Sequence, residues 1–245
     1  MNTYKKVLPL AVAMALAACG GGSDTVPDQS EGATFHGTYP KFNPVTSDLP
    51  LNTDLIFADA PTSDGTANVG VATNPVEAAV NGLDGFSTNA YFDIAFEGSI
   101  DSASVCTLTD ATVKMACALP NVFLLPLNTG EGDALDPSNI DPMSPVLSAA
   151  ITPVTASVVS LDGGTNNVLR IIPEQPLQAK TKYLVFVTNT VMDANGDPIK
   201  ASTAYDLLGE NEPAVSGSLA AVRGAIQGWE AIAGGVLAVN GLAAD

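Results

Sequence analysis

Histidine is nearly absent from this sequence: its 245 residues include one, His36, in a polar segment rich in glycine, serine, threonine and proline. A serine–histidine–acid mechanism needs an imidazole within hydrogen-bond reach of the serine hydroxyl. The nucleophile motif Gly-x-Ser-x-Gly is also missing, and Ser87 is interpreted as a turn or strand-entry residue. A catalytic serine–lysine pair remains possible because the chain contains both residue types, but no spacing between them indicates a particular pair. The sequence therefore predicts no catalytic residues and no enzyme activity for this chain.

Basic residues are also scarce. The chain has nine lysines and arginines against 26 aspartates and glutamates, a net charge of −17. Residues 1–18 contain Lys5 and Lys6 and no acid, so the remainder has seven basic and 26 acidic residues and a net charge of −19. Such a surface repels nucleic acid and anionic lipid headgroups. Nucleic acid is therefore excluded as a partner.

No hydrophobic run is long enough to span a membrane. The apolar run from Val7 to Ala18 follows two lysines and is shorter than the roughly 20 residues of a spanning helix. Residues 1–18 are therefore predicted to be a secretory signal. Leu16-Ala17-Ala18-Cys19 resembles the lipobox of bacterial lipoproteins, which implies a lipid on Cys19; the alternative is a chance cysteine. By the same resemblance, a glycine rather than an acidic residue at position 20 favours the outer membrane as the location of the lipid-anchored protein. The sequence does not determine whether the protein faces the periplasm or the cell surface.

Cysteine is rare, with three residues in all. Beyond Cys19, an even pair remains, Cys106 and Cys117, which favours a disulfide in an oxidising compartment. Closing a loop of that size could stabilise the fold by about 3 kcal/mol. Two buried free thiols are the alternative. Two cysteines without a nearby histidine supply too few ligands for a metal site, and no cofactor is predicted.

Two acidic segments could suggest calcium. Asp193, Asn195 and Asp197 imitate the start of an EF-hand loop, but Ala204 stands where the glutamate should be. The same residues, with Gly196, form a strong hairpin-turn signal. A second cluster, Glu131 to Asp141, is explained by a solvated loop. The sequence therefore predicts no metal site, with weak calcium binding as the less favoured reading.

Short segments rich in valine, isoleucine and aromatic residues, bounded by glycine, proline, aspartate and asparagine, predict a mainly β fold. In one of them Phe92, Ile94 and Phe96 alternate onto a single face. A short helix after the cap Asn74, and a C-terminal amphipathic helix over 216–239, complete the pattern. The strands are expected at 55–58, 90–96, 121–127, 156–161, 168–172 and 183–188, within an immunoglobulin-like β-sandwich.

The domain organisation follows from these patterns. Residues 1–18 are the signal peptide and residues 19–48 a flexible tether between lipid and domain. Residues 49–204 are assigned to the sandwich domain. Residues 205–245 are a linker and amphipathic helix, which we expect to lead into a catalytic domain that this sequence does not contain.

Two segments late in the chain carry a fold resemblance. Pro176-Leu177-Gln178-Ala179 with Thr181-Lys182-Tyr183, and then the turn Asp193 to Pro198, resemble the final strands of bacterial immunoglobulin-like domains of surface proteins. This resemblance implies a corner at Tyr183, whose hydroxyl turns back onto upstream backbone, and a last hairpin closed by Asp193, Asn195 and Gly196. Valine occupies position 185, where antibody domains have a cysteine, so no inter-sheet disulfide is expected there.

A second resemblance concerns function. Asn81 to Thr88, with Asp84-Gly85-Phe86-Ser87-Thr88 as its most specific part, and Gly98 to Val105 are similar to the N-terminal domain of bacterial virulence factor lipases. The resemblance runs from the lipobox to the C-terminal helix and so covers nearly the whole chain. The resemblance implies a non-catalytic anchoring and presenting module, followed beyond residue 245 by an α/β-hydrolase domain that acts on lipids or lysophospholipids. The alternative is a self-contained surface immunoglobulin-like lipoprotein with a role in adhesion or envelope structure.

Overall fold

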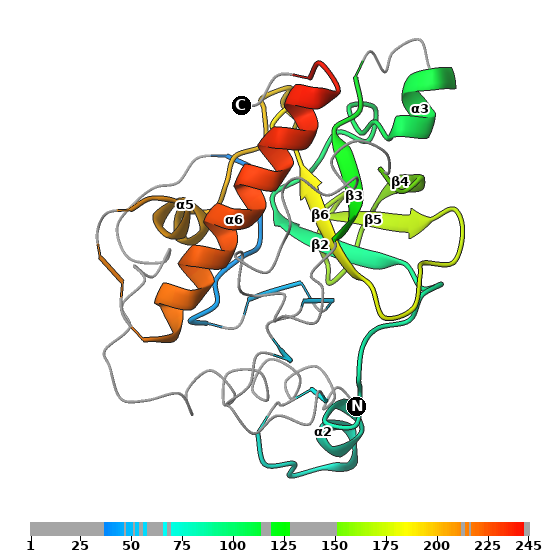
Figure 1. Ribbon diagram of the computed structural model, residues 1–245. Helices are drawn as coiled ribbons and strands as arrows, with labels where there is room; N and C mark the ends of the chain where they lie inside the picture. Colours follow the sequence, from blue (N-terminus) through cyan, green and yellow to red (C-terminus); the bar gives the residue numbers. More distant parts are fainter. Residues whose placement is uncertain are drawn as a thin grey trace.

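The structure is a computed structural model that describes residues 37–46, 48–50, 52–53, 56–57, 66–67, 70–113, 119–127, 151–211, 214–215 and 217–242. Most of its regular elements before residue 200 are short antiparallel strands, and a long helix follows them (Figure 1). The prediction of a mainly β fold is therefore confirmed. The elements are β1 (Tyr39–Pro40), α2 (Pro75–Val80), β2 (Phe92–Glu97), α3 (Leu108–Val113), β3 (Val122–Leu127), β4 (Val154–Val159), β5 (Val168–Pro173), β6 (Lys182–Val187), α5 (Thr203–Gly209) and α6 (Ser218–Val239).

The strands form two antiparallel sheets. One has the order β1-β2-β5-β4, and the other pairs β3 with β6. Within the first sheet, Ile94 lies opposite Leu169, which lies opposite Val158 on β4. This register places the alternating apolar residues of three strands on one face, because side chains two residues apart point the same way.

A single core joins the two sheets. Its buried residues come from β2, β4 and β5 on one side and from β3 on the other, together with residues of the connecting loops. Side chains of β6 pack against it in half-buried positions. The fully or nearly fully buried members are Phe96, Ile100, Val105, Val122, Leu124, Val154, Leu169, Ile171, Val191 and Ile199.

The strand order matches that of an immunoglobulin domain without its last strand. In constant-type domains, strands A, B, E and D form one sheet and C, F and G the other. When β1 to β6 are assigned to A to F in chain order, both observed sheet orders agree. No described residue occupies the position of strand G beside β6. The strand order is therefore consistent with the expected immunoglobulin-like topology, and the sandwich itself stays a prediction.

Helix α6 covers the second face of the β3-β6 sheet (Figure 1). Ile232 and Val236 pack there against Leu125 and Leu127 of β3. Towards its N-terminal end the same helix packs on α5, where Ile226 is 1% exposed. Trp229 contacts both groups of residues. The apolar stripe of this helix therefore packs on the chain's own core.

The ends of the helices follow from local hydrogen bonds. The side chain of Asn74 accepts from the backbone N–H groups of Val76 and Glu77, which caps α2 as expected. Helix α6 ends where Leu242 N–H donates to Leu237 O at 2.8 Å and Gly241 N–H donates to Ala238 O at 3.1 Å. With Gly241 at φ +70°, this is the Schellman arrangement that terminates a helix.

Several elements differ from the sequence interpretation. Ile56 and Phe57, expected in a strand, lie in a helical turn; residues 55 and 58 lie outside the described residues. Strand β1 falls inside the segment 19–48 that the sequence assigns to a tether. Helix α5 occupies part of the expected linker, and α3 follows Cys106 without having been predicted. Short helices and a two-residue strand give no readable period, because each spans less than two repeats.

Candidate functional site

The lipid and disulfide positions are only partly described. Cys19, His36 and Cys117 lie outside the described residues. Cys106 is 3% exposed, and its backbone N–H donates to the Asn121 side-chain oxygen at 2.8 Å. Asn121 in turn donates its side-chain N–H to Ser104 O at 2.8 Å. These contacts fix the backbone at the first cysteine, while the Cys106–Cys117 bridge stays a prediction.

Tyr183 is the second residue of β6. Its hydroxyl accepts a hydrogen bond from the backbone N–H of Gln178 at 2.9 Å. A hydroxyl that binds upstream backbone a few residues earlier is the contact that defines a tyrosine corner. Val185, two residues on, packs against the core shared by the sheets. The corner fixes how the chain enters β6.

The turn after β6 is organised around the Asp193 carboxylate. One carboxylate oxygen accepts from the backbone N–H groups of Asn195 and Asp197, at 2.8 and 3.0 Å. Gly196 N–H donates to Asp193 O at 3.0 Å, and Gly196 has φ +85°, a conformation that glycine adopts without steric cost. The residues predicted as a turn therefore form one. Among the described residues no strand follows it; the two arms of the turn are joined by one isolated bridge, Met192–Pro198, and Asp193 forms a second isolated bridge with Ile100.

The electrostatics of Asp193 argue for a structural role. Burial tends to raise the pKa of its carboxyl, but the backbone hydrogen bonds from Asp197 and Asn195 outweigh burial and lower the pKa. The carboxylate is thus committed to protein donors. In the described part of the chain, no group of three or more histidine, cysteine, aspartate or glutamate side chains could hold a metal ion. The second acidic segment, residues 131–141, lies outside the described residues.

Asp193 also meets the beginning of the described chain. The Thr38 hydroxyl approaches its second carboxylate oxygen at 3.4 Å. Next to this pair, Gly98 has φ +100°, and a Cβ there would lie 2.4 Å from the Thr38 hydroxyl oxygen. Glycine is therefore required at position 98 for both its conformation and its size. The cluster joins three distant segments, and it was not expected from the sequence.

Ser87 has the role that the sequence suggested. Its hydroxyl oxygen accepts from the backbone N–H groups of Asn89 and Ala90, at 3.3 and 3.2 Å. Serine hydroxyls commonly bind backbone two and three residues ahead in this way, and so stabilise turns. Ser87 lies just before β2 and shapes its entry.

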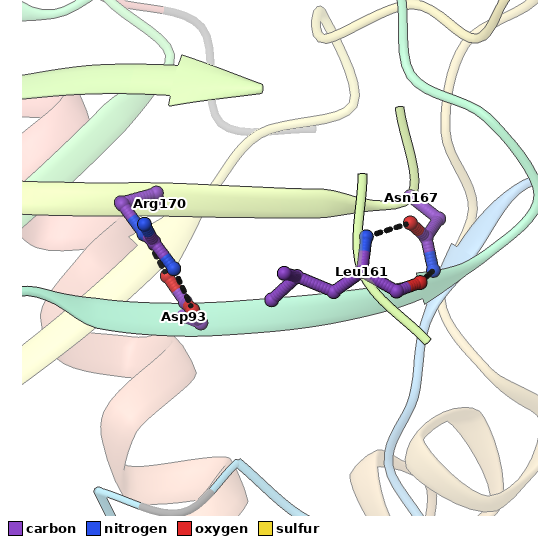
Figure 2. Close-up of polar contacts among 4 residues, drawn as sticks. All are labelled: Asp93, Leu161, Asn167 and Arg170. Atoms are coloured by element: carbon purple, nitrogen blue, oxygen red, sulfur yellow. Dashed lines mark hydrogen bonds and ion pairs between the residues drawn. The ribbon is translucent and has the colours of Figure 1, made fainter. Parts of the chain in front are cut away.

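The outer face of the four-stranded sheet carries an ion pair that the sequence did not reveal (Figure 2). Arg170 Nε and Nη2 donate to the two carboxylate oxygens of Asp93, at 2.9 and 2.8 Å. The Arg170 guanidinium also lies over the Tyr91 ring, 3.8 Å from its centroid. The hydrogen bonds that Arg170 donates to the Asp93 carboxylate raise the pKa of Arg170. Only the β2-β5 register, which places Asp93 opposite Arg170, could have predicted the pair.

A second polar group ties α5 to α6. Arg223, 9% exposed, donates to Leu207 O at 2.7 Å and to Asn211 O at 3.1 Å. The pKa of Tyr205 is raised, first by burial and then by Glu230. These contacts satisfy carbonyl groups at the end of α5. They hold the two helices together and offer no nucleophile activated by a base.

Within the described residues, no helix has the length and apolar character needed to cross a bilayer.

The comparison with protein families finds a match in the C-terminal part of the chain. Residues 133–240 match the family described as bacterial virulence factor lipase N-terminal. The family resemblance found in the sequence is confirmed over this segment. The match begins after residues 81–88 and 98–105, which carried the resemblance, and it covers β4 to α6 among the described elements. Searches of curated proteins and of solved structures found no match.

Proposed function

We propose that this chain is the non-catalytic N-terminal anchoring and presenting module of a surface-exposed outer-membrane lipoprotein lipase. The observation that carries the proposal is the family match over residues 133–240. A family named as the N-terminal part of lipases makes an associated C-terminal hydrolase domain plausible. That domain would hydrolyse lipids or lysophospholipids, and the present chain would hold it away from the membrane.

The polar contacts support a non-catalytic role. The candidate groups described above bind backbone or one another: Ser87 caps a turn, Asp193 organises one, and Arg170 is held by Asp93. Acyl transfer at a serine requires a base within hydrogen-bond reach and a donor pair for the oxyanion. The only histidine, His36, comes from the polar segment before β1. An ester-hydrolysis assay on the isolated chain should therefore give background rates, and turnover abolished by Ser87→Ala would contradict the proposal.

The anchor is proposed to be a lipid on Cys19. Acyl chains add about 0.8 kcal/mol of membrane affinity per buried methylene, so two or more chains hold a protein stably. Labelling cells with a radioactive fatty acid tests this. Cys19→Ser should abolish labelling and release the chain from the outer-membrane fraction. Cys117→Ser is the matched control and should remain labelled; equal labelling of Cys19→Ser would contradict the anchor.

The link to a hydrolase is tested at the gene. An in-frame continuation beyond codon 245 that encodes Gly-x-Ser-x-Gly would establish the lipase architecture. A stop codon there would favour the second candidate, a self-contained immunoglobulin-like lipoprotein in adhesion or envelope structure. The observation that favours this second candidate is the strand order of β1 to β6, which is that of an immunoglobulin domain short of one strand.

A further inference from the structure

The free edge of β6 presents unpaired backbone groups. Thr188 N–H donates to Asn121 O at 3.0 Å, on the side of β6 that faces β3. In an antiparallel pair, the residues that bond to the neighbour alternate with residues that point away from it. The backbone N–H and C=O groups of Tyr183, Val185 and Val187 therefore point away from β3, because each of these residues is an odd number of positions from Thr188.

The opposite strand gives the same assignment. Leu124 faces Val185 in the register, and its carbonyl accepts from Thr152 N–H at 2.7 Å on the far side of β3. Pro126, which has no N–H to donate, faces Tyr183. Both are positions at which β3 and β6 exchange no hydrogen bonds. Within the described residues, the N–H and C=O groups of Tyr183, Val185 and Val187 therefore have no partner.

The following chain leaves this edge uncovered. In an immunoglobulin domain, strand G returns beside strand F, which corresponds to β6. Here Ile199 N–H donates to Val191 O, and Lys200 N–H donates to Thr38 O, each at 3.0 Å. The segment that could have formed strand G thus runs next to β1, in the other sheet. Among the described strands, β6 is therefore the outermost one of its sheet.

The edge is also apolar on both faces. Tyr183, Val185 and Val187 are half-buried against the core between the sheets. Leu184 and Phe186 are half-buried on the α6 side. Edge strands of monomeric proteins usually carry a charge, a proline or a bulge that prevents pairing. Strand β6 has one charge, Lys182 at its first residue, and residues 183–187 have no charge, proline or bulge. A strand that extends this sheet must itself be apolar on both faces.

We propose that β6 pairs antiparallel with β6 of a second copy of this chain. The three residues with outward-pointing backbone groups are spaced evenly about Val185. A two-fold axis through Val185 therefore gives a hydrogen-bond partner to the N–H and C=O groups of all three residues. Tyr183 then lies opposite Val187 of the second copy, an aromatic and β-branched pair that is favourable across strands. Leu184 lies opposite Phe186 of the second copy. The product is a continuous sheet of β3 and β6 from both copies.

Net charge sets the conditions under which this dimer forms. Each copy carries −17, so the two bodies repel one another, although the paired residues 183–187 are uncharged. The Debye length falls from about 30 Å at 0.01 M salt to about 8 Å at 0.15 M. Added salt should therefore strengthen the dimer, the opposite of what an interface built on ion pairs would show.

Light scattering of the purified full chain carrying Cys19→Ser tests the proposal directly. The expected result is a mass of two copies at micromolar concentration, with a dissociation constant that falls when salt is raised from about 0.01 to about 0.15 M. A mass of one copy at both salt concentrations, up to the highest soluble protein concentration, would overturn the proposal.

Cysteine cross-linking tests the register. Residues directly opposite each other in a hydrogen-bonded pair have Cα atoms about 5.5 Å apart, within the range of a disulfide. Val185→Cys should therefore cross-link to its own copy under mild oxidation. Leu184→Cys is the matched control, because it faces Phe186 of the second copy and should give no covalent dimer. Equal cross-linking of both variants, or of neither, contradicts the two-fold axis at Val185.

Proline substitutions separate dimerisation from folding. Val185→Pro removes an outward donor and should leave a folded monomer by circular dichroism and light scattering. Leu184→Pro removes the donor that faces Leu125 of β3 and should abolish the folded signal. A folded Val185→Pro chain that remains a dimer overturns the proposal. If Val185→Pro does not fold, the cross-linking result at positions 184 and 185 decides.

Discussion

Arg170 and Asp93 face each other across β5 and β2 and share two hydrogen bonds, of 2.9 and 2.8 Å. The fork of a guanidinium matches the two oxygens of a carboxylate, and a lysine cannot reproduce that geometry. The Tyr91 ring covers the guanidinium. The outer face of the sheet is thus held by a contact that depends on shape as well as charge.

Replacing Arg170 with lysine should lower the melting temperature by a few degrees. The charge is kept, but the paired hydrogen bonds and the contact with Tyr91 are lost. Asp93→Asn removes the charge and one of the two acceptor oxygens. In a double-mutant cycle, the two changes should be less than additive, because both break the same contact. Additive effects in thermal denaturation would show that the two side chains are energetically independent.

Asp193→Asn should make folding less sensitive to acid. The pKa of Asp193 is lowered in the fold, so its contribution is fully present above the unfolded value of about 3.9 and is lost as pH falls through the lower folded value. The wild-type chain should therefore lose stability more steeply than the variant between about pH 5 and pH 2. The asparagine oxygen can still accept the N–H groups of residues 195 and 197, while its amide nitrogen replaces the second carboxylate oxygen, which faces the Thr38 hydroxyl. Denaturant titrations at several pH values give the measurement, and parallel pH profiles would contradict it.

Tyr183→Phe should reduce the free energy of unfolding by about 1 kcal/mol, the typical net value of one hydrogen bond. The ring keeps its packing against the core, while the bond from Gln178 N–H is lost. Tyr91→Phe is a matched control, because Tyr91 is 50% exposed and its contact with Arg170 is through the ring. Urea denaturation should place the control within about 0.5 kcal/mol of wild type; equal losses in both variants would remove the special role of the corner.

Ile226→Ala should reduce stability by about 2–5 kcal/mol, because the side chain is buried where α6 meets α5 and its removal leaves a cavity. Ala221→Ser, on the exposed side of the same helix, should change stability by less than about 0.5 kcal/mol. Both are measured by urea denaturation. A small loss for Ile226→Ala would mean that α6 is not part of the cooperative unit.

Gly98→Ala should destabilise the fold through two separate effects. Alanine at φ +100° is strained, and its Cβ would collide with the Thr38 hydroxyl oxygen, 2.4 Å away. Removing that oxygen with Thr38→Ala in the same chain should recover part of the lost melting temperature, leaving the backbone strain. No recovery in the double variant would show that conformation alone accounts for the loss.

Strands β2 to β6 could be predicted from sequence because each carries its own signal. Phe92, Ile94 and Phe96 alternate along β2 and all pack against the core, and Asn74 followed by proline marked the start of α2. The stripe of α6 was equally clear, since Leu219, Ile226 and Val236 recur at helical spacing and are buried. These features depend on neighbours within one element.

What could not be predicted depends on pairing between distant segments. Tyr39 and Pro40 look like part of a polar tether until β2 is placed beside them. The Thr38, Gly98 and Asp193 cluster joins positions up to 155 residues apart. The turn at Asp193 was correctly predicted, but the strand expected after it is absent because the chain turns instead towards Thr38. Asn240-Gly241, which ends α6, is a helix-stop signal that could have been recognised from sequence.

The strands that pair with β5 and β6 determine which truncated forms of this protein can fold. Residues 133–240 define the family match, yet β6 pairs only with β3 among the described strands, and β5 draws one of its two neighbours from β2. If the matched segment were expressed alone, β6 would lose its pairing partner β3. Helix α6 would also lose the β3 residues on which it packs. The matched segment is thus one part of a larger structural unit, and a truncation at the family boundary would break the fold.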